Sequence, residues 1–410
     1  MKNLATLIQE FCPEGVKFVK LGDVMDISRG ASPRPIQKYL TDDPSGVNWI
    51  KIGDVENNAK YITETKEKIT AEGALKSRLL HKGDFVLSNS MSFGRPYILA
   101  IEGCIHDGWI SMSNYQSVLL PDFLYHLLRS YNIQKYWKQK ASSGTVSNLN
   151  ADIVRKTEIP LPPIDVQTEI VRILDKFTEL EAELEAELDC RKRQYEYYRD
   201  KLLSFENVGG QDVEWKKIGD FCDTLSGFPF ESSKFQYSGI KLMRGKNVKR
   251  GYFDFNEEDD RYWESSEGLE KYLLQDGDII ISMDGSLVGK SFAMLKEEHL
   301  PLLLVQRVAR VRAIGVNQKY LYHNISNGFS KYVDTKKTGG AIPHVSMKDI
   351  QNFEIPVPSL QEQERIANIL DRFESLTTSL TAGLPAEIAA RRKQYEHYRD
   401  KLLTFKRKSA

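Results

Sequence analysis

Few side chains in this 410-residue sequence have the types and spacing that catalysis or metal binding needs. The run GSLVGKS at 285–291 resembles a phosphate-binding loop, but three residues separate its glycines where that loop has four. His106 and Asp107 could form a catalytic pair, although a lone polar pair in a loop is more often structural. The seven histidines and four cysteines show no zinc-like spacing. The sequence therefore predicts a chain with no catalytic residues, metal or cofactor of its own.

Basic and amide side chains gather in loops, where they could contact DNA. Arg and Lys hold phosphates, and Arg, Lys and Asn also read base edges through hydrogen bonds. The densest cluster is at 241–250, and the acidic run 257–260 that follows it predicts segregated charge. For any single residue, a solvated basic loop is the simpler interpretation. The candidate DNA-binding residues are Arg29, Arg34, Lys38, Lys51, Asn57, Asn58, Arg95, Lys140, Lys241, Arg244, Lys246, Asn247, Lys249, Arg250, Lys290, Lys336 and Lys337.

Composition limits the class of protein. The length exceeds what one compact core usually holds, which favours two or more domains. Hydrophobic residues make up 41% and charged residues 28%, a globular balance that excludes wholesale disorder. Lys plus Arg equals Asp plus Glu at 57 each, so the basic excess of a simple nucleic-acid-binding protein is missing. Because no apolar run reaches about 18 residues and the cysteines are unpaired in spacing, we expect a cytoplasmic protein without a membrane span.

The sequence contains a duplication. RKRQYEYYRDKLLSF at 191–205 recurs as RRKQYEHYRDKLLTF at 391–405. EIPLPPIDVQTEIVRILDKF at 158–177 recurs as EIPVPSLQEQERIANILDRF at 354–373. The two offsets differ by about one helical turn. The chain therefore alternates a globular unit and a long helix, twice.

The repeated blocks predict long amphipathic helices. No Gly or Pro occurs between 165 and 205, and apolar residues recur there with helical spacing. The second copy contains Gly383 and Pro385, which should interrupt it, and Ser359 and Glu362 have capping-box spacing. A helix with one apolar stripe needs a partner, and the obvious partner is the other copy. The acidic first copy and the mildly basic second copy favour that pairing.

An outward face of these helices could recruit another protein. A repeated cluster of aromatic and basic residues suits that role, because Tyr and Arg are favoured at interfaces. The simpler alternative is an intramolecular spacer or a dimerisation coil. The candidate partner-binding residues are Gln194, Tyr195, Tyr198, Arg199, Lys201, Gln394, Tyr395, Tyr398, Arg399 and Lys401.

The globular units are predicted to be α+β with substantial sheet. Short apolar or β-branched runs predict strands at Phe85–Ser88, Ile279–Ser282 and Leu302–Val311. Apolar periodicity predicts a helix near Asp122–Lys140 and a counterpart around Tyr320–Val333.

Together these motifs resemble the specificity subunit of type I restriction-modification systems. The resemblance covers nearly the whole chain and rests on both EIP-[LV]-P…ILD-[KR]-F blocks and both QYE-[YH]-YRDKLL blocks, supported by the openings VKFVKLGD and VEWKKIGD. It implies target-recognition domains at 1–157 and 207–353. It also implies conserved helical regions at 158–206 and 354–410 that pair as an antiparallel coiled coil, in a pseudo-two-fold internal repeat.

The resemblance implies a non-catalytic subunit that confers DNA sequence specificity. Each recognition domain would read one half of a bipartite target in double-stranded DNA, and the paired helices would set the spacer and dock two modification subunits. Adenine methylation with S-adenosylmethionine, and cleavage with ATP and magnesium, would belong to the modification and restriction subunits of the full complex. Two alternatives remain: a stand-alone tandem DNA-binding regulator, and a coiled-coil adaptor that does not bind DNA.

Overall fold

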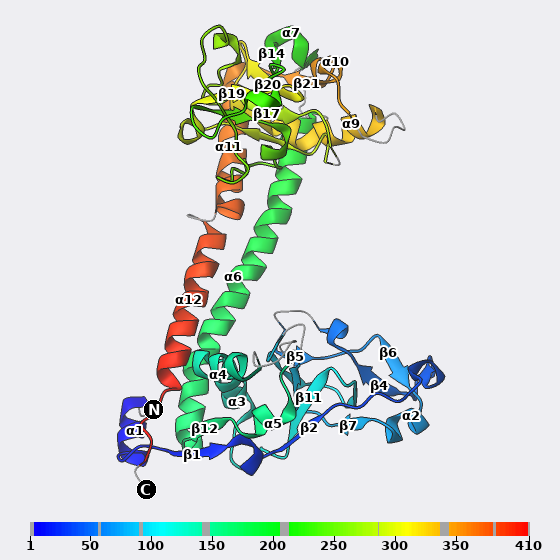
Figure 1. Ribbon diagram of the computed structural model, residues 1–410, viewed down its shortest axis with the longest axis vertical. Helices are drawn as coiled ribbons and strands as arrows, with labels where there is room; N and C mark the ends of the chain where they lie inside the picture. The colour runs from blue at the N-terminus through cyan, green and yellow to red at the C-terminus, as the bar shows by residue number, and fades with distance from the viewer. Residues whose placement is uncertain are drawn as a thin grey trace. The chain divides into compact units, whose positions relative to one another are not determined.

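The structure is a computed structural model of the chain, shown as a ribbon in Figure 1. The chain divides into two compact units: unit 1 holds residues 1–185 and 387–410, and unit 2 holds residues 186–386. No helix in the described residues is long and apolar enough to cross a membrane. The residues that the structure describes are 4–55, 59–89, 93–141, 148–205, 213–285, 287–336, 344–379 and 383–408.

The globular part of unit 1 is built on two five-stranded sheets. One consists, in spatial order, of β2 (Asp26–Arg29), β11 (Trp109–Ser113), β8 (Phe85–Ser88), β9 (Pro96–Leu99) and β5 (Tyr61–Ile62). The other consists of β3 (Leu40–Thr41), β6 (Glu67–Ile69), β4 (Val47–Ile50), β10 (Gly103–Ile105) and β7 (Arg78–Leu80). Strand β8 has the predicted bounds, and all its residues are buried, as expected for a short apolar run.

The predicted helix at 122–140 is two helices, α3 (Pro121–Leu128) and α4 (Tyr131–Ala141). The side-chain amide of Gln134 donates to the carbonyl of Leu128 at 2.7 Å and so satisfies the end of α3. No Gly or Pro occurs at this break, and the helical spacing of the apolar residues continues across it, so the sequence predicted a single helix. The described residues of unit 1 also form the helices α1 (Leu4–Phe11), α2 (Ala71–Leu75) and α5 (Ala151–Arg155).

Unit 2 contains a four-stranded and a three-stranded sheet. Strand β17 (Ile279–Ser282) has the predicted bounds, but the predicted strand at 302–311 is two strands in different sheets. Arg307 between them has a left-handed φ of 70°, which a strand cannot contain. The first sheet holds β14 (Cys222–Ser226), β20 (Val308–Ala313), β17 and β18 (Phe292–Met294), and the second holds β16 (Tyr262–Trp263), β15 (Ile240–Met243) and β19 (Leu302–Leu304).

Helical segments of unit 2 repeat those of unit 1. The predicted helix at 320–333 is a continuous helical run that includes one π-helical turn. Its parts are α8 (Gln318–Asn324), η8 (Ile325–Phe329) and α9 (Ser330–Lys336), and the short helices are α7 (Ile218–Phe221) and α10 (Met347–Gln351).

The repeated sequence motifs form the same element in each unit. Strand β1 (Lys17–Lys20) pairs antiparallel with β12 (Glu158–Leu161), and β13 (Glu214–Lys217) pairs in the same way with β21 (Glu354–Val357). Each pair joins the opening of a globular domain to the EIP segment that leads into a long helix. The duplication in sequence is therefore a duplication of structure.

The long helices agree with the sequence. Helix α6 runs over Ile164–Ser204, and the second helical region is divided into α11 (Leu360–Thr378) and α12 (Leu384–Leu402) at Gly383. Gly383 has φ of 83°, and a Cβ there would lie 2.7 Å from the carbonyl oxygen of Leu376. The predicted capping box is only half formed: Ser359 accepts from the backbone N–H of Glu362, whose carboxylate instead binds Arg365.

Each unit contains a pair of long helices. In unit 1, Phe177 of α6 stacks on Tyr398 of α12 with ring centroids 5.3 Å apart, and Arg392 of α12 binds both Glu181 and Glu185. The α6 number falls as the α12 number rises, so this pair is antiparallel. The ion pairs confirm that opposite charges meet there.

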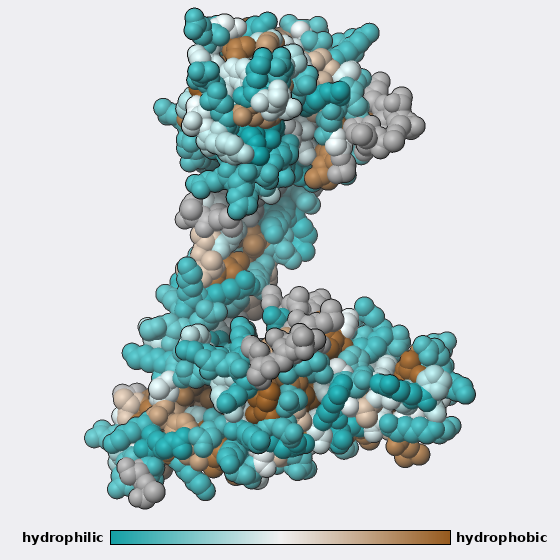
Figure 2. Space-filling model, in the orientation of Figure 1, coloured by the Kyte–Doolittle hydropathy of each residue, from teal (hydrophilic) through white to brown (hydrophobic). Residues whose placement is uncertain are grey.

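In unit 2, the end of α6 lies beside α11 (Figure 1), where Tyr198 stacks on Phe373 at 6.0 Å. Apolar residues of both helices enter the core beneath the sheet and helices of the unit, among them Leu203 and Ile366. The visible surface of each unit is mostly hydrophilic (Figure 2).

Candidate nucleic-acid interface

Two predicted DNA-binding residues of unit 1 converge on one carboxylate. Arg29 donates from Nε to the backbone oxygen of Asp107 at 3.0 Å, and Arg34 donates to the Asp107 carboxylate at 3.4 Å. The hydrogen bond from Ser32 is the main reason that the pKa of Asp107 lies below its ordinary value, so the carboxylate stays ionised. The Arg29 and Arg34 side chains are 66% and 82% exposed. Since a guanidinium has five N–H donors, both keep donors free for a base or phosphate.

Asp107 does not form a catalytic pair with its neighbour His106. The ring of His106 accepts a hydrogen bond from the backbone N–H of Gly108 at 2.6 Å, and burial lowers the pKa of the ring. Asn89 donates to the backbone oxygen of Asp107 at 3.2 Å. The His–Asp pair therefore shapes the loop that carries the two arginines, as the simpler interpretation predicted.

The other candidates of unit 1 lie in varied surroundings. Lys51 is bound to Glu67 at 2.6 Å, which leaves it less available to DNA. Lys38 and Lys140 are exposed, and Arg95 is half-buried. Asn57 and Asn58 lie outside the described residues.

The basic cluster of unit 2 is neutralised by the acidic run that follows it. Lys241 binds Asp260 at 3.0 Å, Lys246 binds Asp259 at 2.7 Å, and the Arg244 guanidinium donates to the backbone oxygen of Asp259. The predicted segregation of charge is therefore wrong, because the loop at 254–260 folds back on the cluster. The order of residues along the chain did not reveal the contact between this loop and the basic cluster.

Asn247 is wrongly predicted as a DNA-binding residue. Its side chain is only 2% exposed, accepts from the backbone N–H of Arg244 at 3.1 Å and donates to the backbone oxygen of Asp254 at 3.0 Å. It therefore holds the turn together. Lys249 lies 3.7 Å from Asp254, whereas Arg250 and Lys290 are exposed. Lys336 ends α9, and Lys337 lies outside the described residues.

Two of the predicted partner-binding residues are instead used within unit 1. Tyr395 and Arg399 of α12 are buried, and the hydroxyl of Tyr395 lies 2.8 Å from Nδ1 of His126 in α3. The guanidinium groups of Arg129 and Arg399 lie over the Tyr395 ring. The partner-binding prediction does not hold for these two side chains, because they are buried in contacts within unit 1.

The remaining members of that cluster divide by exposure. In unit 2, Gln194, Tyr195 and Arg199 are half-buried, and Tyr195 packs near Phe373. Tyr198 and Tyr398 are more than 40% exposed despite their ring contacts across the helix pairs. The exposed candidates are Tyr198, Lys201, Gln394, Tyr398 and Lys401, and partner binding remains a prediction for them.

The sequence interpretation missed a buried polar group that joins the globular domain of unit 1 to its helices. Nε2 of His126 binds Asp175 of α6 at 2.9 Å, and Lys60 lies 2.6 Å from Asp122 and 3.7 Å from Asp175. Burial would raise the pKa of Asp175, but the hydrogen bond from His126 and the charge of Lys60 outweigh it and lower that pKa. Burial lowers the pKa of His126, so its ring is neutral at pH 7.

A sequence signal for this group exists. The tripeptide LYH occurs at 124–126 and again at 321–323, and the motif ILD ends at Asp175 and at Asp371. His323 of α8 binds Asp371 of α11 at 2.7 Å, as His126 binds Asp175. The repeat therefore contains one His–Asp contact per unit, between the globular domain and its long helix.

A comparison with known families decides the identity of this duplicated architecture. Residues 13–189 and 210–390 each match the type I restriction modification DNA specificity domain. The chain belongs to this family. It carries two copies of the domain, each combining a globular part with most of one helical region. This organisation is the fold that the motifs predicted: two α+β recognition domains and two helical regions.

Relatives of this specificity-domain protein support the assignment. The specificity subunit of the type I restriction enzymes EcoR124I and EcoR124II from Escherichia coli is 40% identical over 263 residues, which is 61% of this chain and 63% of the relative. That match spans less than two thirds of the relative. The specificity subunit of the type I enzyme EcoprrI from Escherichia coli is 24% identical, covering 89% of both chains.

The fold also matches solved structures. A chain from a study of complex assembly and conformational transition in a type I restriction-modification system superposes with a TM-score of 0.68 at 18% identity, covering 95% of this chain and 98% of that chain. At this identity the likeness concerns the fold.

Proposed function

We propose that this chain is the sequence-specificity subunit of a type I restriction-modification enzyme, and that each globular domain reads one half of a bipartite DNA target. The observation that carries the proposal is the pair of family matches in one chain. The helical blocks of the two copies are closely similar, whereas the globular sequences diverge. This is the pattern expected when one helical task is performed twice and two different half-sites are read.

Direct reading of bases needs side chains that are exposed but held in a defined orientation. The Arg29 and Arg34 pair on Asp107 has both properties in unit 1. In unit 2 the exposed Arg250 and Lys290 remain the best candidates, because acidic side chains already bind much of the 241–249 cluster. We propose Arg29 and Arg34 as the strongest candidates for contacts to the first half-site.

Methylation and cleavage are proposed to reside in other subunits. We propose that two modification subunits dock on the long helices and supply S-adenosylmethionine chemistry, and that restriction subunits supply ATP- and magnesium-dependent cleavage. The equal numbers of basic and acidic residues support this division, because much of the phosphate contact would then come from partners.

An exchange of recognition domains tests the proposal. Residues 20–140 are replaced by the corresponding segment of another family member, and the chimera is expressed with its modification subunit. Mapping of methylated bases should show one half-site changed and the other retained. The reciprocal exchange in unit 2 is the control, because it should change only the other half-site. A change in both half-sites, or no methylation dependent on this chain, would contradict the two-reader proposal.

A coiled-coil adaptor without DNA binding is the alternative that the neutral net charge favours. The two proposals differ in their salt dependence. A specificity subunit in its complex should lose DNA affinity steeply as salt rises, because Lys and Arg release counterions from the phosphates. An adaptor should show no such DNA affinity, and a stand-alone regulator should show it without any partner.

A further inference from the structure

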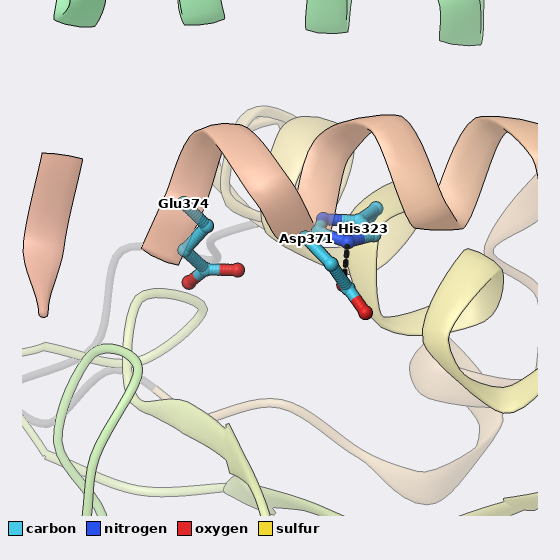
Figure 3. A group of neighbouring side chains, drawn as sticks. All are labelled: His323, Asp371 and Glu374. Carbon is cyan, nitrogen blue, oxygen red and sulfur yellow. Dashed lines mark hydrogen bonds and ion pairs between the residues drawn. The ribbon is translucent and has the colours of Figure 1, made fainter. Parts of the chain in front are cut away.

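Three side chains of unit 2 with metal-ligating chemistry lie together between α8 and α11. One ligand atom from each of His323, Asp371 and Glu374 lies within 4.8 Å of those of the other two. Asp371 and Glu374 are three residues apart on α11 and leave the same side of that helix (Figure 3), and His323 comes from α8. The group is therefore held by two packed helices and not by a loop.

Two polar groups in this cluster have no hydrogen-bond or ion-pair partner among the described residues. The His323 side chain is only 1% exposed, and its Nε2 binds Asp371, but its Nδ1 has no hydrogen-bond partner in the described structure. No hydrogen bond or ion pair within the described ranges reaches the carboxylate of Glu374, which is only partly exposed. Buried polar atoms are normally satisfied, so an orphan in a native structure requires an explanation.

The internal repeat shows how the same position is completed without an ion. In unit 1 the equivalents of His323 and Asp371 are His126 and Asp175, and Nδ1 of His126 is satisfied by the hydroxyl of Tyr395. The position equivalent to Glu374 is Thr178, which has no carboxylate. Unit 2 therefore differs in two ways: the second ring nitrogen is open, and a second carboxylate is present beside it.

We propose that His323 and Glu374 bind a divalent transition metal ion of the Zn²⁺ type, and that Asp371 orients the His323 ring. Imidazole nitrogen and carboxylate oxygen are ligands that Zn²⁺ accepts, with water completing the coordination. Nε2 of His323 already binds Asp371, so Nδ1 is the ring nitrogen left for the ion, and Asp371 takes the orienting place of the carboxylate in a carboxylate–histidine–metal arrangement. Mg²⁺ and Ca²⁺ prefer all-oxygen sites and should bind more weakly.

Neighbouring positive charges oppose the ion, and the charge of Lys296 acts on the Glu374 carboxylate. Nζ of Lys319 lies 2.7 Å from the second oxygen of Asp371 and would repel a cation. The Lys319 side chain is 53% exposed, so it can turn into solvent when an ion enters. The bound ion would join α8 of the recognition domain to α11 of the helical region, which is a structural role independent of the proposed DNA specificity.

The test uses the full-length chain after removal of metals with a chelator. Zinc titration by calorimetry should give one site per chain, and the unfolding midpoint should rise with zinc concentration because the ion binds the folded state. Glu374→Gln should weaken zinc affinity by at least about 10-fold. This isosteric change removes no described contact, so folding should be retained, and circular dichroism checks this.

Matched variants identify the site. Glu364→Gln changes an exposed carboxylate on the same helix and should leave zinc affinity unchanged, as should Asp175→Asn at the equivalent contact of unit 1. Lys319→Met should strengthen zinc binding because it removes the competing ammonium. Absence of zinc binding up to about 1 mM would overturn the proposal, as would zinc binding that Glu374→Gln leaves intact or that depends on the cysteines.

Discussion

Removal of a single hydroxyl tests how α12 is held to the first recognition domain. The Tyr395 hydroxyl lies 2.8 Å from Nδ1 of His126, a side chain that is 0% exposed. Burial raises the pKa of Tyr395, so the hydroxyl keeps its proton and donates to the neutral ring. Tyr395→Phe retains the ring contacts with Arg129 and Arg399 but leaves the buried Nδ1 without a partner.

The expected cost follows from that unsatisfied nitrogen. Leaving a buried acceptor unpaired lowers the free energy of unfolding by about 1–3 kcal/mol. In a unit of this size each kcal/mol lowers the unfolding midpoint by about 2–4 °C. Differential scanning calorimetry measures the change, and amide hydrogen exchange locates it, because α3 and α12 should lose protection together while α8 and α11 should not.

The internal repeat provides the control. Tyr195 is the equivalent residue in unit 2, but within the described residues Nδ1 of His323 has no hydrogen-bond partner, so Tyr195→Phe leaves no buried ring nitrogen newly unpaired. Its cost should be at most about 1 kcal/mol. Equal losses from the two substitutions, or a Tyr395→Phe variant with unchanged exchange in α3, would refute the idea that this hydroxyl holds α12 to the recognition domain.

Three other predictions follow from the same contacts. Burial lowers the pKa of His126, so the unfolded chain binds more protons at this site than the folded chain does. The stability that the neutral His126 contributes is therefore complete above about pH 6.5 and is lost as the pH falls through the folded pKa. Amide exchange rates of α3 measured across that pH range should show this loss. Asn247→Ala should lower the free energy of unfolding, measured with denaturant, by about 1–3 kcal/mol. Arg250→Ala should change that free energy by no more than about 0.5 kcal/mol but should weaken DNA binding by the assembled complex. The reverse pattern would contradict both assignments. Deleting residues 181–184 shortens α6 by about 6 Å, which is comparable to one or two base-pair steps of about 3.4 Å. Methylation mapping should then show both half-sites retained with a changed spacing between them. An unchanged spacing would exclude a spacer role for the helix.

Local signals in the sequence were sufficient for the long elements. Helix α6 begins and ends within one residue of the Gly- and Pro-free run at 165–205, and the interruption near Gly383 was predicted from residue type. Strands β8 and β17 were also predicted with their observed bounds. These elements depend on apolar period and on backbone breakers, both of which act within a few residues.

The errors have a common physical origin in contacts between distant residues. The break between α3 and α4 depends on a side chain of the second helix, and the strand at 302–311 divides because its two halves join different sheets. The predicted positive charge of the cluster at 241–250 is neutralised because the acidic loop at 254–260 folds onto it. Propensity and charge counts do not contain such pairings, so the candidate DNA contacts were less predictable than the fold.

The way the repeated helical blocks are divided between the two units explains their similarity without an external partner. Unit 1 contains the QYEHYRDKLL block of the second repeat, and unit 2 contains the QYEYYRDKLL block of the first. Each block therefore packs within a unit whose ILD helix comes from the other repeat, and each unit presents an LYH helix. Two blocks that meet the same pair of surfaces are expected to stay alike. The buried Tyr395 and Arg399 belong to this internal task, and any modification subunit must use the exposed side chains that remain, such as Tyr198 and Tyr398.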